Sequence, residues 1–235
     1  MNEKRKKVIE NNIEKINKDI HIHSKTPEVV KLVVVTKFAE LEDVEILYEL
    51  GLRDYGENKV QKIKEKKEYF ENKKNDIKWN FIGNLQKNKV KYIAEDICLI
   101  HSINKLSLAS EIEKQGKKHN RVIKGLIEIN ISKEEGKEGY ILEEFLEDIP
   151  EYLKMENLKI VGLMAMAPFT SDDEIIRTVF SKMKKLQEEL NCRFFKGELV
   201  ELSMGMSNDY KIALEEGATI IRVGTKIFEE EKWEK

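Results

Sequence analysis

The sequence predicts a single α/β domain folded as a (β/α)8, or TIM, barrel with an extra N-terminal helix. Eight apolar, strand-like runs alternate with helical patterns almost without interruption, which is typical of parallel crossover units that close into a barrel. The length of 235 residues is within the usual range for one such barrel. Prolines occur only at positions 27, 150 and 168, and no segment has low complexity. Residues 1–235 are therefore expected to form one domain without a linker.

Each element follows from the period of its apolar residues. The leading segment, residues 3–20, has isoleucines on one stripe at positions 9, 13, 16 and 20, as in an amphipathic helix. Gly51 and Gly217 follow helical patterns where a left-handed residue often ends a helix. Strands are expected at residues 32–36, 52–55, 79–82, 97–101, 125–131, 160–164, 199–202 and 219–223. Helices are expected between them at residues 41–50, 60–70, 89–94, 105–118, 141–153, 173–190 and 209–216.

An open, doubly wound sheet is the alternative arrangement of the same elements. Such a sheet often has a glycine-rich dinucleotide-binding turn after its first strand. Residues 36–40 contain no glycine. This favours the closed barrel.

Charge and hydropathy argue against several classes of partner. The 42 Lys and Arg residues nearly balance the 44 Asp and Glu residues, so nothing indicates binding to nucleic acid or to an anionic membrane. The basic run at residues 62–67 alternates with acids at helical spacing and is interpreted as a solvated helix face. No apolar run approaches the ~20 residues that cross a bilayer, and the N-terminus has no signal-peptide pattern, so a cytoplasmic location is expected.

Metal chemistry is not expected. Cys98 and Cys192 lie too far apart in the sequence to form a metal knuckle or a redox pair, and both are expected to be free thiols. The pair His21 and His23 lacks the further ligands of a metal site.

Lys37 is the first candidate for chemistry. It follows a β-branched run, so it is expected at the carboxyl end of the first strand, where ligands bind in α/β folds. A lysine among apolar side chains has its charged form disfavoured, which makes the amine available for a Schiff base with a carbonyl cofactor. The alternative is an ordinary solvated lysine at the end of a strand.

Two later turns have the composition of a phosphate site. The segment that follows the seventh strand contains Ser203 and Ser207. The segment that follows the last strand contains Gly224 and Thr225. Turns of small and hydroxylated residues before a helix offer backbone NH groups and hydroxyls to phosphate, and the loops after strands seven and eight of (β/α)8 barrels often bind it. Alternatively, Ser207 only caps its helix and Gly224 only eases a turn.

An ordered series of motifs runs from about Leu32 to Phe228. It comprises Thr36-Lys37, Tyr55-Gly56-Glu57-Asn58, Trp79 to Lys89, His101-Ser102, Asn130-Ile131-Ser132, Gly162-Leu163-Met164, Leu202 to Ser207 and Arg222 to Thr225. Together these motifs resemble the pyridoxal phosphate homeostasis protein family, which is similar to the barrel domain of alanine racemase. Two positions depart from the family pattern: Asn80 stands where histidine is usual, and Asn84 where proline or histidine is usual.

The resemblance implies binding of pyridoxal 5'-phosphate (PLP). Lys37 would hold the cofactor aldehyde as a Schiff base, and Asn58 would lie beside the ring, although this asparagine could equally only form a turn. The phosphate ligands implied by the resemblance are Ser207, Gly224, Thr225 and, with them, Ser203.

Arg222 has the greatest bearing on mechanism. By resemblance to the racemase barrel it would face the pyridine nitrogen, where a permanent guanidinium charge disfavours ring protonation. An unprotonated ring is a poorer electron sink, so carbanion chemistry is disfavoured. The alternative is a surface arginine in a salt bridge.

Three functions remain open. The protein could carry or buffer PLP for vitamin B6 homeostasis without substantial catalysis and deliver it to PLP-dependent apoenzymes. It could be an amino-acid racemase, or an interaction protein that senses the cofactor. In the racemases that the barrel resembles, a further β-rich domain supplies one acid/base group. The sequence ends at Lys235, soon after the last barrel motif. This favours the non-catalytic carrier, and no catalytic residue is assigned.

Overall fold

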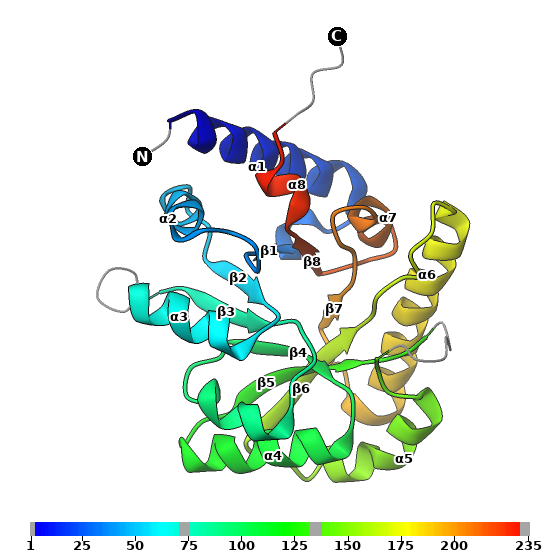
Figure 1. The fold of residues 1–235 in the computed structure, drawn as a ribbon. Coiled ribbons are helices and arrows are strands. Elements are labelled where there is room, and N and C mark those ends of the chain that lie inside the picture. Colours follow the sequence, from blue (N-terminus) through cyan, green and yellow to red (C-terminus); the bar gives the residue numbers. More distant parts are fainter. Residues whose placement is uncertain (1–2, 71–75, 132–137, 231–235) are drawn as a thin grey trace.

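Eight parallel strands pair in chain order and close into a barrel that is surrounded by helices (Figure 1). The computed structural model describes residues 3–70, 76–131 and 138–230. The strands are β1 (Lys31–Val35), β2 (Asp54–Glu57), β3 (Lys78–Phe81), β4 (Leu99–Ile103), β5 (Ile123–Glu128), β6 (Leu158–Met164), β7 (Glu201–Ser203) and β8 (Ile220–Val223). The α-helices are α1 (Glu3–His23), α2 (Leu41–Glu49), α3 (Val60–Phe70), α4 (Leu106–Lys118), α5 (Leu142–Tyr152), α6 (Asp173–Leu190), α7 (Tyr210–Glu215) and α8 (Thr225–Phe228).

The predicted barrel and its extra N-terminal helix are confirmed. Strand β8 closes the barrel against β1, with Lys31 opposite Ile220 and Val34 opposite Val223. Gly51 and Gly217 have φ values of 86° and 91°, as expected for left-handed residues that end helices. No helix in the described part of the chain is long and apolar enough to cross a membrane.

Four helical segments differ from the sequence prediction, and one of them is the 3-10 turn η1 (Pro27–Val29), which was not expected. The segment expected at 89–94 is the 3-10 helix η2 (Lys87–Tyr92) and not an α-helix. It is short, and tighter 3-10 turns are the usual form of such connectors. A π-helical turn, η3 (Asn191–Phe195), follows α6, and the four-residue helix α8 follows β8. Neither segment is long enough to produce a periodic apolar pattern.

The apolar residues form two layers. A large outer cluster lies between the strands and the helices, and it includes the four isoleucines predicted on the buried stripe of α1. A small inner cluster fills the barrel itself and contains Val33, Leu99, Leu126, Val161, Met164 and Ile220. Side chains alternate along a strand, so residues two positions beyond these in β4, β5 and β8 also point into the barrel.

Helix α1 holds the end of the barrel that carries α8. Arg5 makes a two-pronged ion pair with Asp43, with nitrogen–oxygen distances of 2.8 and 2.9 Å, and donates to the carbonyl of Phe228 at 2.7 Å. Asn12, also on α1, donates to the carbonyls of Ile227 at 3.1 Å and Glu229 at 2.9 Å. These bonds fix α8, whose first residue, Thr225, is separated from the end of β8 only by Gly224.

Truncation of Ile16 tests the packing of α1. Ile16 is buried in the outer cluster, whereas Ile22 on the same helix is 73% exposed. We expect Ile16→Ala to lower the free energy of unfolding by about 2–5 kcal/mol, because a buried isoleucine leaves a cavity. The matched change Ile22→Ala should cost less than about 0.5 kcal/mol. Urea denaturation measures both, and equal losses would show that α1 does not pack as described.

Candidate functional site

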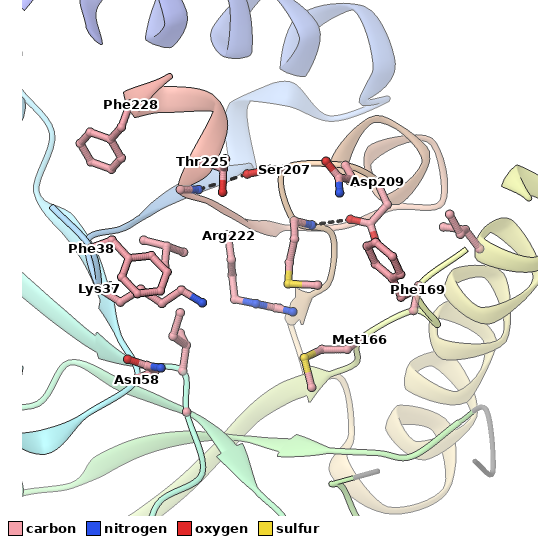
Figure 2. Close-up of a pocket in the computed structure, with 18 of the residues that line it drawn as sticks. Lys37, Phe38, Asn58, Met166, Phe169, Ser207, Asp209, Arg222, Thr225 and Phe228 are labelled. Carbon is pink, nitrogen blue, oxygen red and sulfur yellow. Dashed lines mark hydrogen bonds between the residues drawn. The ribbon is translucent and has the colours of Figure 1, made fainter. Parts of the chain in front are cut away.

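A cavity of about 1400 Å³ opens at the carboxyl end of the barrel. The loops after β1, β2, β3, β5, β6, β7 and β8 contribute residues to its lining, as the rule for ligand sites in (β/α)8 barrels predicts. Six of the seven residues predicted for the site line this cavity: Lys37, Asn58, Ser207, Arg222, Gly224 and Thr225. The seventh, Ser203, lies beneath it. Figure 2 shows the Lys37 amine and the Arg222 guanidinium directed into the cavity, with Ser207 and Thr225 on one side and Asn58 on another.

Lys37 is exposed and lies in the turn that follows β1. Its Nζ lies 5.1 Å from the ring centroid of Phe38, which is 88% exposed. The apolar surroundings expected for the Lys37 amine are therefore limited to the ring of Phe38 on one side. Lys226 is the lysine near the other wall, but its Nζ lies over the ring of Tyr210 at 5.1 Å and it does not line the cavity.

A buried ion pair holds the backbone in front of Lys37. Lys66 on α3 donates to Glu57 Oε1 at 2.6 Å and to the carbonyl of Thr36 at 2.5 Å. The Thr36 hydroxyl donates to the same carboxylate oxygen at 2.6 Å. Lys66 and Glu57 are almost fully buried, so removing one partner would leave an uncompensated charge. The network fixes where the turn that carries Lys37 begins.

The prediction of a solvated basic face on α3 is wrong for Lys66. Within the run at residues 62–67, Lys62 is exposed and pairs with Glu65, as predicted. Lys66, however, lies three positions after Ile63 and four before Phe70, on the buried stripe of the helix. This position on the apolar stripe is the signal in the sequence that could have identified it.

The proposed phosphate turn brings β7 and β8 together. The Oγ of Ser207 accepts weak hydrogen bonds from the backbone NH groups of Gly224, at 3.4 Å, and Lys226, at 3.5 Å. Ser207 therefore does not cap α7, whose N-cap residue is Asp209. Gly224 has an ordinary negative φ, but a Cβ there would lie 3.0 Å from the carbonyl oxygen of Val35. Glycine at this position allows close approach to β1 and is not required by a left-handed turn.

Arg222 is buried, with 4% of its surface exposed, so the alternative of a surface salt bridge is wrong. Its Nη1 donates to Ser203 Oγ at 2.6 Å and its Nη2 to the carbonyl of Ala165 at 3.2 Å. Burial lowers the pKa of Arg222 to about 10, while the carboxyl groups of Asp209 and Glu128 favour its charged form. Arg222 therefore remains a cation at neutral pH.

Ser203 is fully buried below the cavity. Its Oγ accepts a hydrogen bond from Arg222 and lies 2.9 Å from Nδ1 of His101. Its side chain points into the barrel and not into the phosphate turn, because it alternates along β7 with Leu202, which packs in the outer cluster. The structure thus separates two serines that the sequence places in one motif.

Asn80, one of the two departures from the family pattern, belongs to the same interior network. Its Oδ1 lies 3.1 Å from Nε2 of His101, and its amide donates to the carbonyl of Lys78 at 3.1 Å. The other departure, Asn84, lies at the surface and donates to Glu138 at 2.6 Å. Sequence reasoning gave His101 no role, although a histidine two positions after Leu99 in an apolar strand indicates an interior polar site.

Glu128 is a buried carboxyl group at the end of β5. Its Oε2 has no hydrogen-bond partner among the residues that the structure describes. Burial, with a smaller contribution from Glu138, raises the pKa of Glu128 to about 7, and the Arg222 charge opposes this rise. Asp209 at the cavity wall accepts from the backbone NH of Met206 at 2.5 Å, and burial raises its pKa as well.

Comparison with known proteins identifies the family. The family described as "Alanine racemase, N-terminal domain" matches residues 7–231. The chain is 41% identical over 222 residues to the pyridoxal phosphate homeostasis protein of Aquifex aeolicus, covering 94% of this chain and 96% of the relative. The chain belongs to the pyridoxal phosphate homeostasis protein family.

Further relatives of this family agree in sequence and in fold. The pyridoxal phosphate homeostasis protein of Synechocystis is 38% identical over 202 residues, covering 86% of this chain and 92% of the relative. The structure of PipY from Synechococcus elongatus with PLP bound superposes with a TM-score of 0.82 at 29% identity, covering 91% of this chain and all of that one. The motif that includes Ser132 lies partly outside the described residues.

Metal ligands do not gather in the part of the chain that the structure describes: no group of three or more His, Cys, Asp or Glu residues there could hold an ion. Cys98 and Cys192 are free thiols.

Replacement of Glu128 tests its proton. Because the pKa of Glu128 is raised in the folded state, the native protein keeps a proton that the unfolded chain loses between about pH 4.5 and 7. The contribution of Glu128 to the free energy of unfolding is therefore lost as the pH rises from about 4.5 through about 7. Glu128→Gln should remove the loss, so its stability relative to the unchanged protein should rise by up to about 3 kcal/mol between pH 5 and 8. Urea denaturation across this pH range measures the effect.

The exposed Glu144 on α5 provides the matched control. Glu144→Gln should leave the pH dependence unaltered. If Glu128→Gln and the unchanged protein lost stability in parallel, Glu128 would not hold a proton at neutral pH.

Proposed function

We propose that this protein binds PLP and carries or buffers it in the cytoplasm, holding it as a Schiff base on Lys37 without substantial catalysis. The observation that supports the proposal most is that an exposed lysine amine and the turn of Ser207, Gly224 and Thr225 face the same cavity. Relatives at 41% and 38% identity are named for PLP homeostasis, and PipY was solved with PLP bound. The proposal therefore rests on family and geometry together.

The residues present fit the groups of the cofactor. The backbone NH groups of Gly224 and Lys226 make only long bonds to Ser207, so a phosphate could replace or share these contacts with the Ser207 and Thr225 hydroxyls. Asn58, partly exposed in the cavity wall, would lie beside the ring. Ser203 would act through Arg222 and not on the phosphate.

Arg222 supports the non-catalytic part of the proposal. PLP bound to an amine supplies an electron sink, whose strength depends on protonation of the ring nitrogen. A buried guanidinium that faces this nitrogen can only donate a hydrogen bond, so it disfavours the protonated ring. The runner-up function, amino-acid racemisation, would need acid/base groups on both faces of the substrate carbon. Delivery to PLP-dependent apoenzymes, or a sensing role toward a protein partner, would follow binding.

Lys37→Ala tests the covalent anchor. We expect the PLP-loaded protein, after borohydride reduction and peptide mapping, to carry its label on Lys37. The Lys37→Ala variant should lose this label while its unfolding free energy changes by less than about 0.5 kcal/mol, because the side chain is exposed. Lys226→Ala is the matched control and should retain the label. A label on Lys226, or unchanged labelling of Lys37→Ala, would contradict the assignment.

Deuterium uptake separates the carrier from the racemase. We expect the PLP-loaded protein to show negligible exchange at the α-carbon of alanine and of several other amino acids in D2O, measured by NMR. The physical reason is that Arg222 keeps the ring a poor electron sink. Robust exchange that disappears in Lys37→Ala would reject the carrier function and support racemisation.

A further inference from the structure

We propose that His101 and Asn80 are positioning residues for Arg222. Together with Ser203 they form a hydrogen-bond chain of fixed direction that holds the guanidinium toward the cavity. This assignment deepens the proposed function. It rests on the proposed function at one point, the placement of the cofactor ring against Arg222. The chain links β3 to β4 and then crosses the barrel interior to β7 and β8.

The direction of the chain follows from the chemistry of its first member. A guanidinium has five donors and no acceptor, so Ser203 Oγ must accept from Arg222. The Ser203 hydroxyl is then free to donate its own proton to His101 Nδ1, 2.9 Å away. A neutral imidazole that accepts at Nδ1 carries its proton at Nε2, which lies 3.1 Å from Asn80 Oδ1 and donates to it.

Asn80 completes the chain on the opposite side of the barrel. Its amide NH2 group donates to the carbonyl of Lys78, which leaves its oxygen directed at His101. Both ends of the chain are therefore fixed, one by a group that can only donate and the other by a backbone carbonyl that can only accept. An amide is suited to the position because it presents one donor and one acceptor at the same time.

Burial keeps the central imidazole neutral. Asn80, His101 and Ser203 are at most 2% exposed. The charges that act on His101 are those of Arg222 and Lys31, and both are positive. Burial and these charges hold the pKa of His101 well below its ordinary value. A second proton on the ring would be carried by Nδ1. The N–H of His101 and the O–H of Ser203 would then be two donors that face each other.

The first test uses the cofactor-free protein. Long-range proton–nitrogen NMR of the histidine rings should show His101 as the neutral Nε2–H tautomer, unchanged between pH 5 and 8. Asn80→Asp, which replaces the amide by a buried negative charge, should convert His101 to the doubly protonated form at pH 7. A wild-type His101 that is cationic or carries its proton on Nδ1 would overturn the proposal.

The second test compares two variants of similar side-chain length. His101→Gln keeps one acceptor and one donor, whereas His101→Met has no donor and only a weak sulfur acceptor. We expect His101→Met to weaken PLP binding roughly tenfold and to shift the pH midpoint of the bound cofactor's absorbance band, because an unanchored Arg222 no longer donates at a fixed angle. His101→Gln should stay within about threefold of the unchanged protein with the same midpoint.

Two outcomes of this second test count against the proposal. If both variants, folded by circular dichroism, bind PLP like the unchanged protein, or if they lose binding equally, hydrogen bonding by residue 101 does not position Arg222. If the unchanged protein does not bind PLP at all, the proposed function fails, while the tautomer of His101 still decides whether the chain exists.

Discussion

The positive charge of Arg222 inside the barrel is the constraint on which the arrangement of the site depends. Moving an ion out of water costs several kcal/mol unless hydrogen bonds and opposite charges offset the loss. Barrels of this class are usually filled by layers of branched aliphatic side chains. Here an apolar layer is followed, toward the cavity, by a layer of polar groups from β3, β4, β5, β7 and β8. In that layer Ser203 accepts a hydrogen bond from the guanidinium, which also donates to the carbonyl of Ala165.

The two lysines near β1 show how environment separates two roles of one residue type. Lys66 is buried against a carboxylate and a carbonyl, so its charge serves the structure. Lys37, one residue beyond that carbonyl, is exposed, and its amine is directed into the cavity. The buried lysine fixes the backbone from which the exposed one extends. A site residue carried by a backbone that buried neighbours hold in place is the arrangement expected of a functional site on a barrel.

Much of the fold could be predicted because each element has its own apolar period. The strands and long helices lie within a few residues of their expected positions, and the turn residues at the carboxyl ends of β1 and β8 reach the cavity as expected. Interactions across the barrel could not be predicted in this way. His101 and Ser203 are 102 positions apart, and no local pattern indicates that they meet. For the same reason the sequence did not reveal that Ser203 points inward while Ser207 reaches the cavity wall.

The pairing of β1 with β8 has a consequence for the order in which the site is assembled during synthesis of the chain. Lys37 lies near the beginning of the chain, whereas Ser207, Arg222 and Thr225 lie near its end, and only the pairing of the first strand with the last brings them together. Ribosomes add about 5–20 residues per second, so roughly ten seconds or more separate the synthesis of the two halves. A nascent chain therefore contains Lys37 before Ser207, Arg222 and Thr225 have been added. The complete lining of the cavity therefore exists only after β8 has been made and has paired with β1.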